Sequence, residues 1–150
     1  MTKETALDFS SLDTAAAAEK SYEFELVRPD NKKPLGVFVS VIGAESPAFK
    51  SRLFKEINRD RRKEFEAKRK GKETEPSTIE EDEANSVSLV ADLVVGWRTV
   101  VNGKSEPVIH WEGEKLDFNT DNVKRWLGRF SWVRAQINEA ANDLANFLSA

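Results

Sequence analysis

The stretch that decides the fold is Ser86-Val-Ser-Leu-Val-Ala-Asp-Leu-Val-Val-Gly-Trp97, where the chain is least suited to face water. Its apolar residues recur at spacings of three and four in two series: Val87, Val90, Val94 and Trp97, and Leu89 and Leu93. An apolar surface this wide is typical of a helix that is covered on more than one side. We therefore predict a central helix here. The alternative is a buried strand, because Leu93-Val-Val95 is short and β-branched.

A start signal for this helix lies upstream. The sequence Thr78-Ile-Glu-Glu81 fits a capping box, in which the threonine oxygen accepts from the backbone N–H three residues on and the glutamate reaches back. The acidic residues 80–83 would lie at the positive end of the helix dipole, which explains the cluster without a metal ion. We expect the helix to run from Ile79 to Gly96, with Gly96 as a left-handed cap.

Composition limits the class of protein. The chain has 150 residues, of which 39% are hydrophobic and 33% charged, and this suits one domain with a real core. Its net charge of −3 argues against a general nucleic-acid binder, which normally carries a basic excess. The absence of cysteine excludes disulfides and thiolate metal sites. Without an apolar run long enough to span a membrane or a secretory leader, we expect a cytoplasmic protein.

The first third of the chain predicts a leader and a hairpin. Residues 1–20 are polar and poor in anchors, so we expect a flexible leader ahead of one α+β domain over residues 21–150. Apolar and acidic residues alternate from Tyr22 to Leu26, and Val37 to Ile42 is apolar on both faces. Between these two predicted strands, residues 28–34 are rich in turn formers.

A charged arm follows the hairpin. Ser46-Pro47 is a helix start, and one face carries Phe49, Leu53 and Ile57. From Asn58 to Lys72 nearly every residue is charged, and we expect Gly71 and Pro76 to end the arm, with residues 58–77 as arm and linker. Such a helix is either a solvated projection or a surface that binds an acidic segment of a partner or of its own chain.

The last third predicts a small hairpin and two helices. Asn102-Gly103 favours a tight turn between strands at residues 99–101 and 108–111. Asn119 or Thr120 would cap a helix over residues 121–127 that Gly128 breaks. Ser131 would cap a final amphipathic helix of about 18 residues. The predicted fold is thus α+β, with an N-terminal β-hairpin packed on a mainly helical bundle and a charged helical arm.

Catalytic signatures are missing. His110 is the only histidine, and without cysteine the usual zinc sites are excluded. No serine lies in a nucleophile elbow, and the glycines are scattered and form no phosphate-binding loop. We therefore predict a protein that is not an enzyme, with no catalytic residue, no metal and no cofactor.

Tryptophan and arginine gather near the end of the chain, and these side chains dominate the binding energy of protein interfaces. The candidate partner-binding residues are Trp97, Trp126, Arg129, Trp132 and Arg134. Tryptophans are also large core residues. We expect at least two of the four tryptophans to be in the core, and one of Trp126 or Trp132 to be partly exposed.

Three short motifs follow one another in the second half of the chain: Leu93-Val-Val-Gly-Trp97, Leu116-Asp-Phe-Asn-Thr-Asp-Asn-Val-Lys-Arg-Trp-Leu127 and Trp132-Val-Arg-Ala-Gln-Ile137. This succession resembles the C-terminal half of tail assembly chaperones of long-tailed bacteriophages and prophages. The stretch Val37-Phe-Val-Ser-Val-Ile-Gly-Ala-Glu-Ser46, followed by a helix containing phenylalanine, resembles their N-terminal half. The charged arm is longer than the family pattern needs.

The resemblance implies a function and partners. Such a chaperone binds the long helical tape-measure protein, recruits tail-tube protein and is absent from the finished particle. It would work in the cytoplasm of an infected or lysogenic bacterial host. A groove between the central and last helices could hold the partner helix. The alternatives are a structural virion protein of the neck or tail and a host-directed regulator whose basic arm binds nucleic acid. The sequence leaves a homo-oligomer open.

Overall fold

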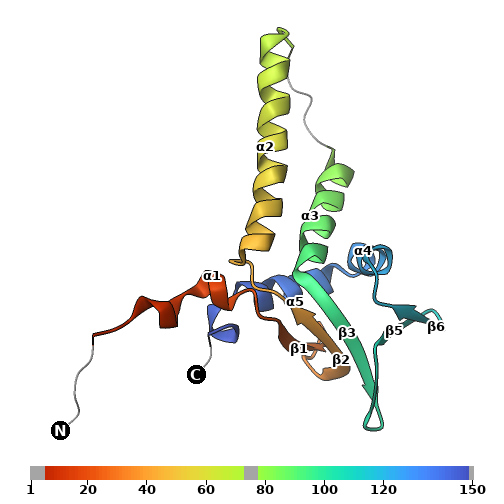
Figure 1. Ribbon diagram of the computed structural model, residues 1–150. Coiled ribbons are helices and arrows are strands. Elements are labelled where there is room, and N and C mark those ends of the chain that lie inside the picture. Colours follow the sequence, from red (N-terminus) through yellow and green to blue (C-terminus); the bar gives the residue numbers. More distant parts are fainter. Residues whose placement is uncertain (1–5, 73–77, 149–150) are drawn as a thin grey trace.

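The computed structural model describes residues 6–72 and 78–148 and combines helices with antiparallel sheets (Figure 1). One sheet has four strands in the order β1 (Tyr22–Val27), β2 (Pro34–Val41), β3 (Val94–Val101) and β4 (Lys104–Glu106). A second sheet pairs β5 (Val108–Trp111) with β6 (Glu114–Asp117). The helices are α1 (Thr14–Ala17), α2 (Pro47–Arg69), α3 (Ile79–Leu93), α4 (Thr120–Arg129) and α5 (Ser131–Asn142). Short 3₁₀ turns cover Phe9–Leu12 and Leu144–Asn146. The predicted α+β class and the N-terminal hairpin are confirmed.

The hairpin of β1 and β2 separates apolar from polar side chains. Tyr22 lies opposite Val41 and Phe24 opposite Val39, and these residues share one face of the sheet. The opposite face carries Glu23, which accepts hydrogen bonds from Arg98 of β3. The second strand begins at Pro34, three residues before the predicted start at Val37. The turn is therefore shorter than predicted, since Pro34, the last residue of the predicted turn, already belongs to the strand.

The central stretch changes from helix to strand at Val94, so the predicted helix from Ile79 to Gly96 is wrong over its last three residues. Val94 and Val95 are β-branched, and β2 offers them a strand to pair with. The N–H of Ile42, just after β2, donates to the Leu93 carbonyl at 2.9 Å, which satisfies a backbone group at the helix end. Gly96 is not a helix cap; it lies in β3 opposite Ser40.

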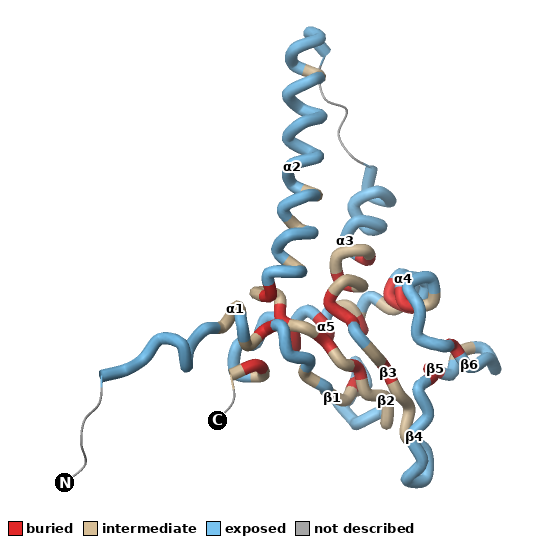
Figure 2. The backbone as a smooth tube through the Cα atoms, in the orientation of Figure 1, coloured by how far each residue is buried: buried red, intermediate tan, exposed pale blue. Residues whose placement is uncertain are grey.

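The core lies where the sheet, α3, α4 and α5 meet, and buried positions concentrate there in Figure 2. Leu93 of α3, Val39 of β2, Leu127 of α4 and Ile137 of α5 are all at most 1% exposed. At the edge of the sheet, the Gln136 side chain accepts from the Val27 N–H at 3.0 Å and donates to its carbonyl at 2.8 Å. The helix layer thus contacts the sheet through both apolar packing and hydrogen bonds.

The C-terminal strands pair differently from the prediction. The turn at Asn102-Gly103 is confirmed, but it joins β3 to β4, and the strand at residues 108–111 pairs with residues 114–117. Both turn residues have positive φ, at 52° and 76°, which Asn and Gly tolerate best. Pro107 separates β4 from β5.

The last two helices also differ in length from the prediction. Gly128 does not break α4, which continues to Arg129. Helix α5 has 12 residues instead of about 18, and a 3₁₀ turn follows it. Ser131 is the first residue of α5 and not its cap; the cap position belongs to Phe130, which makes no side-chain cap bond.

The end of the predicted leader packs against the body of the protein. Ala18 is 1% exposed, its carbonyl accepts from the Gly43 N–H at 2.8 Å, and Thr14 donates to the Glu45 carboxylate. The packed region therefore begins before residue 21, whereas Leu7 and Phe9 are exposed.

The predicted charged arm begins at Asn58 and forms the second half of helix α2, every residue of which is at least partly exposed. It stands away from the sheet beside α3, as Figures 1 and 2 show. The arm ends at Arg69, and Gly71 follows with a φ of +70°. Pro76, the other predicted end, lies outside the described residues. No helix within the described ranges is long and apolar enough to cross a membrane.

Candidate partner-binding groove

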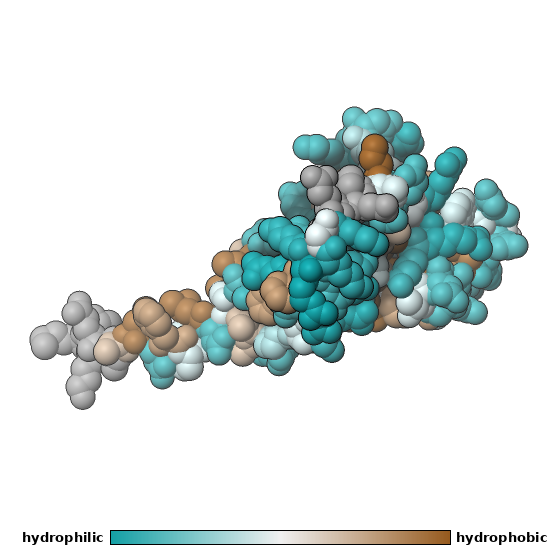
Figure 3. Space-filling model, turned by 90° about the horizontal axis from the view of Figure 1, so that it is seen from above, coloured by the Kyte–Doolittle hydropathy of each residue, from teal (hydrophilic) through white to brown (hydrophobic). Residues whose placement is uncertain are grey.

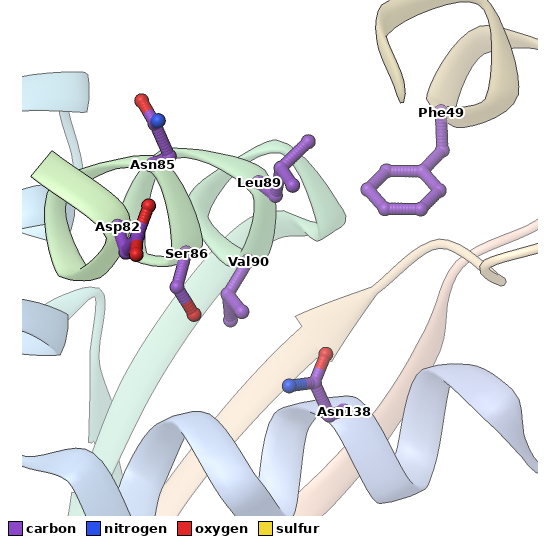
Figure 4. Close-up of a pocket in the computed structure, with 7 residues that line it drawn as sticks. All are labelled: Phe49, Asp82, Asn85, Ser86, Leu89, Val90 and Asn138. Atoms are coloured by element: carbon purple, nitrogen blue, oxygen red, sulfur yellow. The ribbon is translucent and has the colours of Figure 1, made fainter. Parts of the chain in front are cut away.

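A hollow of about 350 Å³ opens between α2, α3 and α5. Phe49 of α2 points its ring across the opening toward Leu89 of α3, and Val90 lies deeper on the same helix (Figure 4). Asn138 of α5 forms the floor. Polar side chains of α3, Asp82, Asn85 and Ser86, line the end of the hollow away from Phe49. We call this hollow the α2–α3 groove; its apolar wall and polar rim suit an amphipathic segment.

Local sequence sets where α2 begins relative to the groove. The Ser46 side chain is fully buried, and its oxygen accepts from the Phe49 N–H at 3.3 Å, as the predicted cap requires. Pro47 occupies the first turn, where its missing N–H costs nothing. Capping therefore starts α2 at a defined residue and brings Phe49 to the mouth of the groove.

An ion pair connects α2 and α3, the two helices that form the walls of the groove. Arg52 of α2 lies 2.8 Å from the carboxylate of Asp92 on α3. The Asp92 side chain is only 15% exposed, and burial raises the pKa of this carboxyl above its usual value of 3.8, while the positive charges of Arg52 and Lys124 act in the opposite direction. The pair is an electrostatic link between α2 and α3.

The two walls carry opposite charge. Helix α2 has nine Lys or Arg and four Asp or Glu, whereas α3 has five Asp or Glu and no Lys or Arg. The Thr78 side chain accepts from the Glu81 N–H at 3.1 Å, which confirms the predicted cap. A segment entering the groove would therefore meet a basic helix on one side and an acidic helix on the other.

Two of the residues predicted to bind a partner are core residues. Trp97 and Trp126 are 5% and 4% exposed, and their rings meet edge to face with centroids 5.2 Å apart. The Phe118 ring also meets Trp97 edge to face, with ring centroids 5.4 Å apart. The expectation of at least two core tryptophans is confirmed. Neither ring presents a surface to a partner in this structure.

The other three predicted residues lie around the start of α5. Trp132 is half-buried and packs on Phe130, so one of the two named tryptophans is partly exposed, as expected. Arg129 is exposed at the end of α4. Arg134 donates to the Leu127 carbonyl at 2.6 Å and lies 3.5 Å from Glu83, so it connects α5 with α4 and α3. None of these three lines the α2–α3 groove.

Sequence reasoning did not single out Leu89 or Asn138 as site residues. The predicted groove lay between the central and last helices, but the contribution of α2 was missed because Phe49 was interpreted only as one face of an arm. The signal was present in the spacing of Phe49, Leu53 and Ile57 together with the cap at Ser46.

His110 is exposed on β5 beside a depression of about 270 Å³ that Lys104 and Glu106 also line. Glu106 accepts a hydrogen bond from Lys115 at 3.0 Å and so is engaged elsewhere. Within the described part of the chain, no three His, Cys, Asp or Glu side chains gather as a metal site would require.

No protein-family model, curated protein or solved structure matches this chain. The grounds for a function are therefore the chemistry of the α2–α3 groove and the resemblance of the sequence motifs to tail assembly chaperones.

Proposed function

We propose that this protein is a non-catalytic binding domain that holds an amphipathic helix of another protein in the α2–α3 groove. The observation that carries the proposal is the position of the Phe49 ring, half-buried and facing Leu89 across an open hollow. A partner helix would complete the burial of both side chains, and because both are already partly buried, each would contribute less than the about 1.5–3 kcal/mol of a fully exposed side chain. Helix-in-groove recognition of this kind reads apolar residues spaced by three and four.

Within that class, we propose a tail assembly chaperone of a long-tailed bacteriophage or prophage, acting in the cytoplasm of its bacterial host. The resemblance of residues 93–97, 116–127 and 132–137 supports this choice. The held helix would belong to the tape-measure protein, and tail-tube subunits would be recruited afterwards. An open groove suits a chaperone, because the held helix must later be released without unfolding its holder.

The groove is tested by filling it. Asn138 is exposed on its floor, so Asn138→Arg adds bulk there with little expected effect on folding. The matched control is Glu139→Arg, at the next exposed position, which does not line the groove. Co-expression with the tape-measure protein of the same genome should give a soluble complex with the parent chain and with Glu139→Arg. Asn138→Arg should lose it at an unchanged melting temperature.

Two results would contradict the proposal. One is failure of the folded parent chain to co-purify with the tape-measure protein at low salt. The other is equal binding by both arginine variants. Mass spectrometry of purified particles separates the alternative function: a chaperone should be absent from the virion, and a structural protein of the neck or tail should be present in fixed stoichiometry.

A further inference from the structure

The segment before α1 carries apolar side chains that the rest of the chain does not cover. Leu7 is 64% exposed, Phe9 75% and Leu12 49%. In Figure 1 this segment leads away from the body, and in Figure 3 its apolar residues follow one another along the extension. We call residues 6–12 the N-terminal arm. Three large apolar side chains exposed together in a short segment indicate a contact surface.

A second uncovered surface lies on α2, on a different side from the α2–α3 groove. A hollow of about 550 Å³ there is lined by Ala15 of α1 and by Glu45, Pro47, Lys50, Ser51, Phe54, Lys55 and Asn58. Phe54 is 55% exposed, and Phe65, eleven residues on, is 68% exposed. Eleven residues make close to three helical turns, so both rings lie on one stripe. We call this stripe the outer α2 face.

The two surfaces match in chemistry. The N-terminal arm offers Leu7, Phe9 and Leu12 with the carboxylate of Asp8 and has no basic residue. The outer α2 face offers Phe54 with Lys50 and Lys55, and the carboxylate that also lines its hollow, Glu45, already accepts from Thr14. Apolar groups would meet apolar groups and opposite charges would pair.

Within one chain, the N-terminal arm is held away from the outer α2 face. Ala18 is fixed to Gly43, and Thr14 donates to Glu45 beside the start of α2. From this anchor the arm points outward and away from α2 (Figure 1). In each copy, the N-terminal arm and the outer α2 face thus begin close to each other. Two copies related by a two-fold axis could therefore exchange arms, each arm docking on the α2 face of the other copy.

We propose that the N-terminal arm of one copy docks on the outer α2 face of a second copy, in a symmetric dimer closed by two such exchanges. The α2–α3 groove lies elsewhere on α2 and stays open in this dimer. The inference is therefore independent of the proposed function.

Sedimentation velocity on the full chain over a range of concentrations tests the exchange. The parent chain should form a dimer. Phe9→Ser removes the arm contact and Phe54→Ser the receiving contact, and each should weaken dimerisation at least tenfold. Both positions are exposed, so circular dichroism should report an unchanged fold. Ile79→Ser, at an 82% exposed position away from both surfaces, is the control and should leave the dimer intact.

Mixing the two variants makes the test specific. The intact N-terminal arm of the Phe54→Ser chain can dock on the intact α2 face of the Phe9→Ser chain. The mixture should therefore form a heterodimer through one exchange, at concentrations at which each weakened variant alone is monomeric. Lys50→Glu with Lys55→Glu should also weaken the parent dimer, and adding Asp8→Lys should restore it. A monomeric parent chain, a dimer that neither serine variant weakens, or a mixture that stays monomeric would each overturn the proposal.

Discussion

At the scale of single residues, Gly43 shows how closely the chain approaches itself. A Cβ added there would lie 2.5 Å from the Ala18 Cβ and 3.1 Å from the Ala18 Cα. We expect Gly43→Ala to lower the free energy of unfolding by about 1–3 kcal/mol, because one of the two segments must shift. Ala18→Gly in the same chain should recover part of the loss. Urea unfolding measures both values.

The control for this prediction is Gly128, where a Cβ would meet nothing within 4 Å. This glycine lies inside α4, so Gly128→Ala should raise the free energy of unfolding by about 0.5–1 kcal/mol through helix propensity. If Gly43→Ala were as harmless as Gly128→Ala, the close contact with Ala18 would be refuted.

Gln136 is a second residue whose effect is specific. Its side chain bonds both backbone groups of Val27, so Gln136→Ala should cost about 1–3 kcal/mol of unfolding free energy. Gln136→Glu should cost less than the alanine variant, since a carboxylate still accepts from the Val27 N–H although it cannot donate to the carbonyl. Chemical denaturation would decide, and equal stability of the parent and alanine chains would contradict the paired bonds.

At the scale of elements, the ion pair between α2 and α3 predicts a pH effect. Burial raises the pKa of Asp92, so the folded state holds the proton more tightly than the unfolded chain. This group therefore favours folding most below its unfolded pKa, and that contribution is lost as pH rises through its folded value. Arg52→Met should raise the Asp92 pKa further, because it removes the nearest positive charge. Carbon-13 NMR titration of the carboxyl in both chains measures this, and a pKa below 3.8 in the parent would refute it.

The elements also show what the sequence could predict. Helix starts at Ser46 and Thr78 were predicted correctly, and Asn119 is the cap of the two candidates, Asn119 and Thr120, because an N-cap is a local hydrogen bond between residues close in sequence. The change from helix to strand at Val94 was missed, because it depends on β2, which lies about fifty residues away in the chain and pairs with β3.

The same contrast applies to the candidate site. A groove between the central and last helices was expected, and Leu89 and Val90 of α3 and Asn138 of α5 do line a groove there, together with Phe49 of α2. Trp97 and Trp126 were placed at an interface because composition alone cannot tell a core ring from a contact ring. Their edge-to-face packing arises only when β3 and α4 come together, and no local pattern encodes that contact.

At the scale of the whole molecule, Leu93 joins the helical layer to the sheet. It is 1% exposed and ends α3 where β3 begins, so Leu93→Asp would bury an unpaired charge at the centre of the core. We expect loss of cooperative unfolding. Val95→Asp, two residues on at a 45% exposed position, should change stability by less than about 1 kcal/mol. Thermal melts compare the two, and an unchanged melting temperature for Leu93→Asp would show that the core is misplaced.

The bonds between Gln136 and Val27 have a consequence for association as well. Strand β1 is one of the two edge strands of its sheet, and edge strands can recruit strands of other chains into fibrils. The amide of Gln136 occupies both backbone groups of Val27, so a foreign strand could not pair with β1 at this residue without displacing the side chain.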